Sequence, residues 1–540
     1  MSFSLETSQS HKTLIGALLA LVFLGICLRF NHIADNDFVF YDEGFYLNYN
    51  RNFGEFIDGF HASDMGEMMK AVQTHIKLSL NSGKALWFMI VDARNFFGLH
   101  EFWAFSRVAS AIFGCLTIGL TYQFAQRYFD SRLMGLLSAA ILAVMPSHVF
   151  YSRIGLQEAC STFLVLAGFY FYLFPRKFTW RTFLGGVLMG AAFFANYRLI
   201  ILPGLVLFTE LVLSVAADRW PNIRKYIWFS LAFFSCVFLI GNIDDGRNTR
   251  IIFAWILHQE NLAHAQFSPV NLLSYPYYLF RLENLFLGLF FLGNIFLAVR
   301  GKWYYLLPFL LVCVQMGIFS FTSDKAARYL CAVTPFIAMA TAFFIGYLYA
   351  FFSAERWRAG FIAVAVIMAL GLTGKSYALS RSHTNYRQAT EFLMSQNANV
   401  RFLSTQNFIQ NLYTPKTKNV LPCPVNFSAL AVWRSRGYEY LVLDPQAYVS
   451  MTDQDLRFNP HLIGYLEFLK NNVKPVKTFP HFNQLLLERF VFEHSANLVQ
   501  SVKFLNIARQ EDLGQLRIYD LSQAINRMMS AAAQYQSVKE

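Results

Sequence analysis

TLIGALLALVFLGICLRF, residues 13–30, contains a single charged side chain, Arg29, in a run long enough to cross a bilayer. A helix needs about 20 mostly apolar residues to span a hydrocarbon core about 30 Å thick. Similar runs recur, and we expect eleven spans, at residues 13–30, 103–126, 133–150, 156–174, 182–196, 199–217, 226–242, 281–299, 303–321, 328–352 and 359–379. The sequence therefore predicts an α-helical polytopic membrane protein.

Composition supports this class. Of 540 residues, 55% are hydrophobic and 14% are charged, whereas soluble domains carry about 25% charged residues. The net charge of +12 comes largely from Lys and Arg in short gaps between apolar runs, which is typical of membrane orientation signals and excludes nucleic acid as a partner. The seven cysteines show no disulfide framework and no metal-ligand spacing.

The first apolar run is not a cleaved signal peptide, because only Lys12 flanks it closely and no small-residue cleavage site follows it. Residues 85–97 are apolar but contain Asp92 and Arg94, so we expect a helix at the membrane interface.

The distribution of basic residues predicts which side of the membrane each loop faces. Thirteen of them fall on one side of the predicted spans: Lys12, Arg127, Arg132, Arg176, Lys177, Arg181, Arg219, Arg224, Lys225, Arg300, Lys302, Arg356 and Arg358. By the positive-inside rule this side is cytoplasmic. The loops 31–84 and 243–280, and everything after Leu379, are then external, in the periplasm of a bacterium or the endoplasmic reticulum lumen of a eukaryote.

The chain divides into a membrane domain, residues 1–380, and a polar C-terminal domain, residues 381–540. In the second domain we expect strands at 400–404 and 438–444 and helices at 390–396 and 428–436. This alternation predicts an extracytoplasmic α/β domain, long enough to bury its own core.

Two adjacent carboxylates, Asp42 and Glu43, stand among aromatic residues in the first external loop, residues 31–84. An outward carboxylate could take a proton from an attacking hydroxyl. The structural alternatives are an N-cap role for Asp42 and a favourable first-turn charge for Glu43.

External cations suit an anionic, phosphate-bearing lipid substrate, since they would stabilise charge growing on a departing phosphate. The candidates are Lys84, Arg153, Lys325 and Arg328. Arg198 lies on the same side, between the expected spans 182–196 and 199–217. Lys84 and Lys325 could instead extend to lipid headgroups, and Arg153 could be a structural partner of Glu158. Attack opposite the leaving phosphate would invert the sugar carbon.

Four segments resemble the GT-C glycosyltransferase superfamily, in the branch of protein O-mannosyltransferases and the lipid A aminoarabinose transferase. They are Tyr41–Tyr46, Ser82–Trp87, Phe150–Glu158 and Ser323–Pro335. The similarity in order and topology covers about residues 10–380. It implies a GT-C-like catalytic membrane domain, a polyprenyl-phosphate sugar donor and transfer outside the cytoplasm.

The resemblance also assigns roles. It implies that Asp42 is the catalytic base, supported by Glu43 or Glu158, and that Lys84, Arg153, Lys325 and Arg328 hold the donor phosphate. The chain departs from the family pattern at Ala85-Leu86, where the family has Pro-Pro, and at Glu158 and Phe45, where it has Asp and Arg. These departures leave the sugar undetermined.

The sequence therefore predicts a transferase that moves a sugar from a polyprenyl-phosphate carrier to a hydroxyl of a lipid, glycan or protein. Its place would be the bacterial inner membrane, in contact with membrane lipids. The alternatives are a transporter or flippase for a lipid-linked or anionic substrate, and a non-catalytic assembly protein.

We expect no metal site in the segment 251–265, which reads as an amphipathic surface helix. His258 and His264 are six residues apart and would not share a helical face with Glu260 between them. No cofactor is required by the sequence, and a divalent cation is an open alternative.

Overall fold

The computed structural model describes residues 9–34, 39–58, 65–96, 99, 104–174, 180–241, 269–300, 303–322, 325–414, 419–424, 427–444, 468–493, 497–510 and 514–539. Its contacts separate two compact units, one of residues 1–34 and 53–381 and one of residues 35–52 and 382–540. The sequence did not predict that residues 35–52, in the first external loop, belong with the C-terminal unit.

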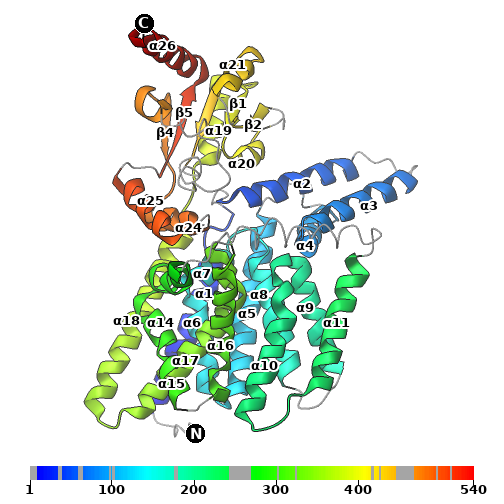
Figure 1. The fold of residues 1–540 in the computed structure, drawn as a ribbon, viewed down its shortest axis with the longest axis vertical. Helices are drawn as coiled ribbons and strands as arrows, with labels where there is room; N and C mark the ends of the chain where they lie inside the picture. The colour runs from blue at the N-terminus through cyan, green and yellow to red at the C-terminus, as the bar shows by residue number, and fades with distance from the viewer. Residues whose placement is uncertain are drawn as a thin grey trace. The chain divides into compact units, whose positions relative to one another are not determined.

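The first unit is a helical bundle (Figure 1). Its helices before the 242–268 gap are α1 (Gln9–Phe30), α3 (Met65–Asn81), α4 (Ala85–Phe96), α5 (Phe105–Phe129), α6 (Arg132–Val144), α7 (Pro146–Tyr151), α8 (Glu158–Leu173), α9 (Trp180–Ala195), η1 (Tyr197–Ile201), α10 (Leu202–Ala216) and α11 (Ile223–Gly241). Those after it are η3 (Pro269–Leu273), α13 (Ser274–Tyr278), η4 (Leu279–Glu283), α14 (Leu285–Leu292), α15 (Asn294–Val299), α16 (Trp303–Ser320), η5 (Ala327–Val333), α17 (Thr334–Phe351) and α18 (Glu355–Ser380).

Each of the eleven expected spans coincides with one helix or with two or three consecutive ones. Seven helical stretches of the described chain are long and apolar enough to cross a membrane, and four others are shorter. The expected span at 133–150 is divided into α6 and α7, because Pro146 has no backbone N–H to continue the helical ladder. The helix expected at residues 85–97 is α4, Ala85–Phe96. The chain is thus an integral, multi-pass membrane protein.

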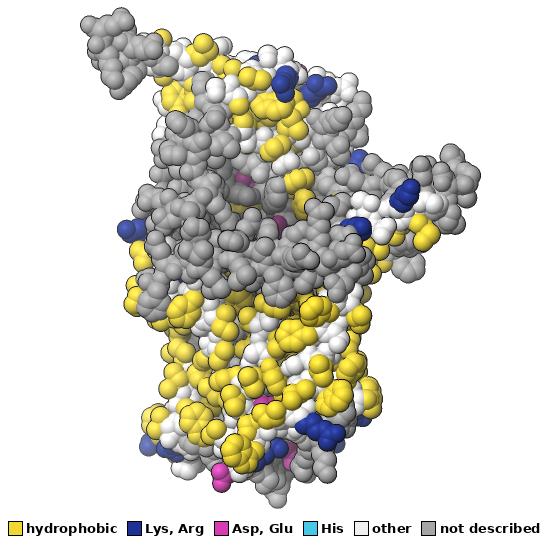
Figure 2. Space-filling model, turned by 45° about the vertical axis from the view of Figure 1, so that its right-hand side comes forward, with side chains coloured by type: hydrophobic (Ala, Val, Ile, Leu, Met, Phe, Trp, Pro, Cys, Tyr) yellow, Lys and Arg dark blue, Asp and Glu magenta, His cyan; other side chains and the backbone are white. Residues whose placement is uncertain are grey.

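The flank of the bundle is apolar, as a lipid-facing surface must be. Figure 2 shows hydrophobic side chains over this flank, with Lys and Arg gathered at one end of it. Large side chains are openly exposed there, such as Phe23 at 69% and Leu239 at 74%. Monomeric soluble proteins rarely expose so large a contiguous apolar surface to water.

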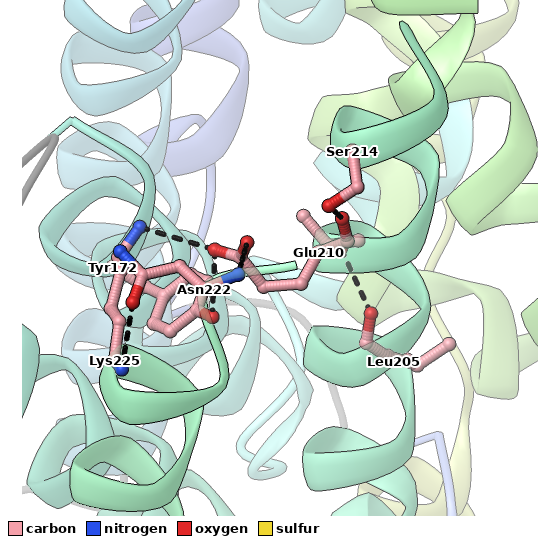
Figure 3. Close-up of polar contacts among 7 residues, drawn as sticks. Tyr172, Leu205, Glu210, Ser214, Asn222 and Lys225 are labelled. Atoms are coloured by element: carbon pink, nitrogen blue, oxygen red, sulfur yellow. Dashed lines mark hydrogen bonds and ion pairs between the residues drawn. The ribbon is translucent and has the colours of Figure 1, made fainter. Parts of the chain in front are cut away.

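The basic end of the bundle also contains a buried ion pair (Figure 3). Glu210 Oε1 accepts hydrogen bonds from the Tyr172 hydroxyl at 2.9 Å and from Lys225 Nζ at 3.4 Å. Glu210 is 1% exposed and Lys225 is 4% exposed. The pair joins α8, α10 and α11, and removing one partner of such a pair typically costs about 3–5 kcal/mol. Lys225, counted above among the orientation signals, therefore has a structural role as well.

The second unit contains a five-stranded mixed sheet in the order β2-β1-β3-β5-β4. Its strands are β1 (Phe402–Ser404), β2 (Val420–Pro422), β3 (Tyr440–Leu443), β4 (Lys477–Pro480) and β5 (Gln515–Asp520). β1 is parallel to β2 and β3, whereas β5 is antiparallel to β3 and β4. Its helices are α19 (Tyr386–Gln396), α20 (Asn407–Asn411), α21 (Phe427–Ser435), α24 (Gln484–Glu493), α25 (Leu498–Gln510) and α26 (Leu521–Lys539).

The predicted strands at 400–404 and 438–444 are β1 and β3, and the predicted helices are α19 and α21. The sheet and its helices bury one core, in which Leu403, Leu441 and Tyr519 from the sheet meet Leu430 of α21 and Leu521 of α26. The C-terminal unit is therefore an α/β domain, as expected.

A neutral histidine lies in the interior of this unit. His481 Nδ1 accepts a hydrogen bond from the Asn385 amide at 3.3 Å, and its ring stacks on Phe482 and meets Tyr386 edge-on. Burial lowers the pKa of His481 to about 3. Below pH 6.5 the unfolded chain takes up a proton at this position while the folded chain does not, so acid favours unfolding.

We predict that the C-terminal unit loses stability as the pH falls from 7.5 to 5.5, by up to about 1.4 kcal/mol per pH unit below pH 6.5. Hydrogen exchange of the β4 and β5 amides in the full-length protein, corrected for intrinsic rates, measures this loss. His481→Gln keeps an acceptor for Asn385 and should flatten the profile. His383→Gln, at an exposed imidazole, should not, and equal profiles for the two variants would contradict the assignment.

Candidate functional site

The two adjacent carboxylates differ in their surroundings. Both lie in the first turn of α2 (Tyr41–Asp58). Glu43 is 0% exposed, and its carboxylate accepts a hydrogen bond from the Val39 amide at 3.0 Å. A carboxylate that reaches back to an amide before the helix satisfies a donor that the helix leaves unpaired. Glu43 thus holds the start of α2, and Asp42 beside it is half-buried.

The rest of this segment is fixed against α20. A Cβ on Gly44 would lie 2.7 Å from the Ile409 backbone nitrogen, so only glycine permits this approach. Asn48 Nδ2 donates to the Phe408 carbonyl, and the Phe45 ring meets the Phe408 ring edge-on with centroids 5.3 Å apart. Within the second unit, the carboxylate pair is therefore presented by a helix that is clamped to the C-terminal domain.

In the first unit, Lys84 directly precedes α4 and follows a tight turn. Gly83 has φ of +69°, and its carbonyl accepts a hydrogen bond from the Tyr197 amide at 3.1 Å. The Lys84 amide donates to Ser82 Oγ at 3.2 Å. The turn thus fixes the backbone of Lys84 against η1, and the Lys84 side chain is half-buried.

Arg198 connects this turn with the late external motif. Its guanidinium carbon lies 5.0 Å from the centroid of the Tyr197 ring and 4.6 Å from that of Tyr329. Each contact has the geometry of a cation–π interaction. Asn196 accepts a hydrogen bond from the Arg198 amide at 3.3 Å and so caps η1. The turn at Gly83, η1 and η5 therefore form one continuous structure.

The late motif itself is tightly packed. Lys325 is 3% exposed, and its Nζ donates to the Thr322 carbonyl at 2.7 Å. Gln315 of α16 donates to the Tyr329 carbonyl at 2.6 Å. Arg328 is half-buried in η5. The motif Lys325–Tyr329 is thus held by its backbone, with two cations within four residues of each other.

Arg153 is bound by backbone carbonyls. Its Nη1 donates to the carbonyls of Leu28 at 2.6 Å and Arg29 at 3.1 Å, and its Nη2 donates to that of Ser380 at 2.8 Å. These contacts join the 152–157 loop to α1 and α18. They favour a structural role for Arg153, although with partners other than the Glu158 considered from the sequence.

The same loop contacts the Lys84 motif. Trp87 Nε1 donates to the Gly155 carbonyl at 3.2 Å, and Ser110 Oγ donates to that of Leu156 at 3.0 Å. Glu158, the first residue of α8, is buried and accepts from Gln157 Nε2 at 3.1 Å. The structure thus joins the segments 82–87 and 150–158 directly.

Three of the four predicted segments, 82–87, 150–158 and the late motif, are accordingly brought together in the first unit, with Arg198 linking two of them. The fourth, with Asp42 and Glu43, belongs to the second unit.

Sequence reasoning missed an imidazole–carboxylate pair in this region. His75 Nε2 and Asp92 Oδ2 are 2.5 Å apart, and both residues are buried where α3 and α4 meet. Asp92 was recognised only as an interruption of an apolar run. The signal that could have found the pair is a helical hairpin across the Gly83 turn, because such a hairpin brings together residues at similar distances before and after the turn.

Among the residues that the structure describes, no three His, Cys, Asp or Glu side chains are grouped as a metal site. The predicted helix 251–265, with His258, Glu260 and His264, lies outside the described residues.

Residues 94–240 match the family described as dolichyl-phosphate-mannose-protein mannosyltransferase. No curated protein matches the chain significantly in sequence. ArnT from Cupriavidus metallidurans, bound to undecaprenyl phosphate, is similar over 81% of this chain and 95% of its own, with 14% identity and a TM-score of 0.53.

The oligosaccharyltransferase of Archaeoglobus fulgidus in its apo form is similar over 84% of this chain and 72% of its own, with 10% identity and a TM-score of 0.56. Its complex with an inhibitory peptide and a dolichol-phosphate is similar over 82% of this chain and 71% of its own, with 10% identity and a TM-score of 0.51. These proteins are GT-C glycosyltransferases. The predicted GT-C fold is thereby confirmed.

We predict that Gly83→Ala lowers the melting temperature of the purified protein and displaces Lys84. Alanine at φ of +69° costs about 1–2 kcal/mol, and its Cβ would lie 2.6 Å from the Tyr197 ring. Gly204→Ala, in a helix with open space around its Cβ, is the matched control and should be neutral or stabilising. Equal melting temperatures for the two variants would contradict this account of the turn.

Proposed function

We propose that this protein is a glycosyltransferase that moves a sugar from a polyprenyl-phosphate carrier to a hydroxyl acceptor outside the cytoplasm. The observation that carries the proposal is the convergence of Lys84, Arg198, Lys325 and Arg328 in one set of linked segments of a GT-C fold. Similar folds hold undecaprenyl phosphate and dolichol-phosphate. The sugar and the acceptor are not specified by these residues.

The proposed reaction is a direct displacement. The oxygen of the acceptor hydroxyl forms a bond to the anomeric carbon, and the bond from that carbon to the phosphate oxygen breaks. The proton of the hydroxyl passes to Asp42, and the lipid phosphate leaves with the bonding electrons. A single displacement of this kind inverts the anomeric centre.

Asp42 is the proposed base because it is the more accessible of the two carboxylates. Glu43 is fully buried and accepts from the Val39 amide. Asp42 is half-buried on the same turn. We assign Glu43 to positioning and place Glu158 in a supporting role at the start of α8, as the resemblance implies.

Lys84, Lys325 and Arg328 are the proposed donor-phosphate ligands, and Arg198 is added to them. Cations fixed before the reaction stabilise charge that develops on the leaving phosphate. Arg153, predicted as a fourth ligand, is assigned instead to holding the loop, because its guanidinium donates to three backbone carbonyls.

The external face and a bacterial inner membrane remain part of the proposal. The charge asymmetry supports the external face, since the opposite end of the bundle carries exposed Arg127, Arg132, Arg219 and Arg300. A transporter would move labelled lipid-linked sugar across a vesicle without transferring it, which an assay of both products distinguishes.

We predict that Asp42→Asn lowers the rate of sugar transfer about 10²–10⁴-fold, the usual contribution of a general base. Glu43→Gln retains a carbonyl acceptor for the Val39 amide and should stay within about tenfold of the native rate. Transfer by reconstituted protein from a radiolabelled polyprenyl-phosphate sugar measures both. If Asp42→Asn keeps full activity in a folded protein, the mechanism is wrong.

Lys84 and Arg153 should respond differently to substitution. Lys84→Gln should raise the KM for the donor about 10–100-fold, as expected for a lost hydrogen bond to a charged group, with an unchanged melting temperature. Arg153→Lys cannot bond to three carbonyls in the same geometry and should lower the melting temperature. Donor-dependent kinetics and thermal unfolding of both variants test this, and the reverse pattern would exchange their roles.

A further inference from the structure

An apolar groove runs along the first unit between α1, α5 and α6, with a volume of about 580 Å³. Along α1 it is lined by Ile15, Leu19, Val22 and Ile26, a spacing that places all four on one helical face. Facing them is Gly119 of α5, and a Cβ built there would have no atom within 4 Å. The groove is therefore open where a side chain could have filled it.

The length of the groove corresponds to one leaflet of a bilayer. From Ile15 to Ile26 the helix rises about 16 Å, and half of a hydrocarbon core is about 15 Å. The groove begins near the basic end of the bundle, at Ile15 and Arg132, and ends near its middle. One extended acyl chain of the leaflet at that end would follow it.

A polar cavity of about 550 Å³ adjoins the groove at its basic end, and Arg132 lines both. Its other lining residues are Gln123, Gln126, Arg127, Asp130, Ser131 and Tyr170. Two arginines against one aspartate leave a net positive charge. An anionic headgroup is thus favoured over a neutral or zwitterionic one.

Arg127 is already oriented in this cavity. Its guanidinium carbon lies 4.6 Å from the centroid of the Phe174 ring, and Nη1 donates to the Tyr170 hydroxyl at 3.4 Å. A stacked guanidinium keeps donors for a phosphate while it loses little conformational freedom on binding.

We propose that the groove and the polar cavity together bind one anionic phospholipid, with an acyl chain along α1, α5 and α6 and its phosphate at Arg132 and Arg127. The site lies at the end opposite the proposed donor-phosphate residues, and it does not depend on the proposed function. Its occupant packs α1 against the α5–α6 hairpin. α1 also supplies the carbonyls of Leu28 and Arg29 that hold Arg153.

Native mass spectrometry of the delipidated full-length protein, titrated with phosphatidylglycerol or phosphatidylcholine, tests the site. We expect one molecule of phosphatidylglycerol to bind more tightly than phosphatidylcholine. Arg132→Gln should weaken phosphatidylglycerol binding about fivefold, equivalent to about 1 kcal/mol for one interfacial cation. Gly119→Phe fills the groove and should abolish the tight site for both lipids.

Two controls are matched to these variants. Gly360→Phe adds the same side chain at another exposed helical glycine with open space around it, and Arg356→Gln removes an exposed arginine at the same end. Both should bind like the native protein. If Gly119→Phe and Gly360→Phe bind phosphatidylglycerol equally well, the groove is not the lipid site. If Arg132→Gln leaves the preference for phosphatidylglycerol over phosphatidylcholine unchanged, the headgroup assignment is wrong. Equally tight binding of glycerol phosphate alone, which has no acyl chain, would also overturn the proposal.

Discussion

The guanidinium of Arg153 imposes the constraint on which much of the membrane unit depends. It donates to carbonyls near the end of α1 and at the end of α18, and so ties the first and last helices of the bundle to one loop. Carbonyls at helix ends have no partner within the helix. A single side chain with a rigid set of donors satisfies three of them at once.

Arg29, in the last turn of α1, likewise donates to backbone carbonyls. Its Nη1 donates to the carbonyls of Gly25 and Ala143 at 2.5 and 2.8 Å, and its Nη2 lies 2.5 Å from His148 Nδ1. Gly114 permits this, because a Cβ there would lie 3.1 Å from Arg29 Nε and closer still to the Ser152 hydroxyl. Arg29 and Arg153 therefore both use their guanidinium groups to satisfy backbone carbonyls.

Hydropathy predicted most of the membrane unit because its signal is local. A run of apolar residues and the charge in its flanking gaps are both read within about twenty positions, and all eleven expected spans coincide with helices. In the C-terminal unit β1 and β3 were found as apolar runs. β2, β4 and β5 were missed, and each of the three contains side chains that are only partly buried.

The parts that sequence reasoning missed depend on distant contacts. His75 and Asp92 lie on two helices, and neither residue by itself has a metal or catalytic spacing. Lys225 obeys the pattern of an orientation signal, yet its partner Glu210 stands fifteen residues earlier on another helix. The assignment of residues 35–52 to the second unit rests on Gly44 and Asn48 meeting α20, more than 350 positions away. No local pattern encodes such a contact.

The division of labour within the carboxylate pair follows from helical geometry. Successive residues of an α-helix point about 100° apart, so Asp42 and Glu43 cannot share one environment at the start of α2. Glu43 turns back to the Val39 amide and is enclosed, which leaves Asp42 as the more accessible carboxylate. The motif thus needs both residues, one to fix the turn and one for the proposed chemistry.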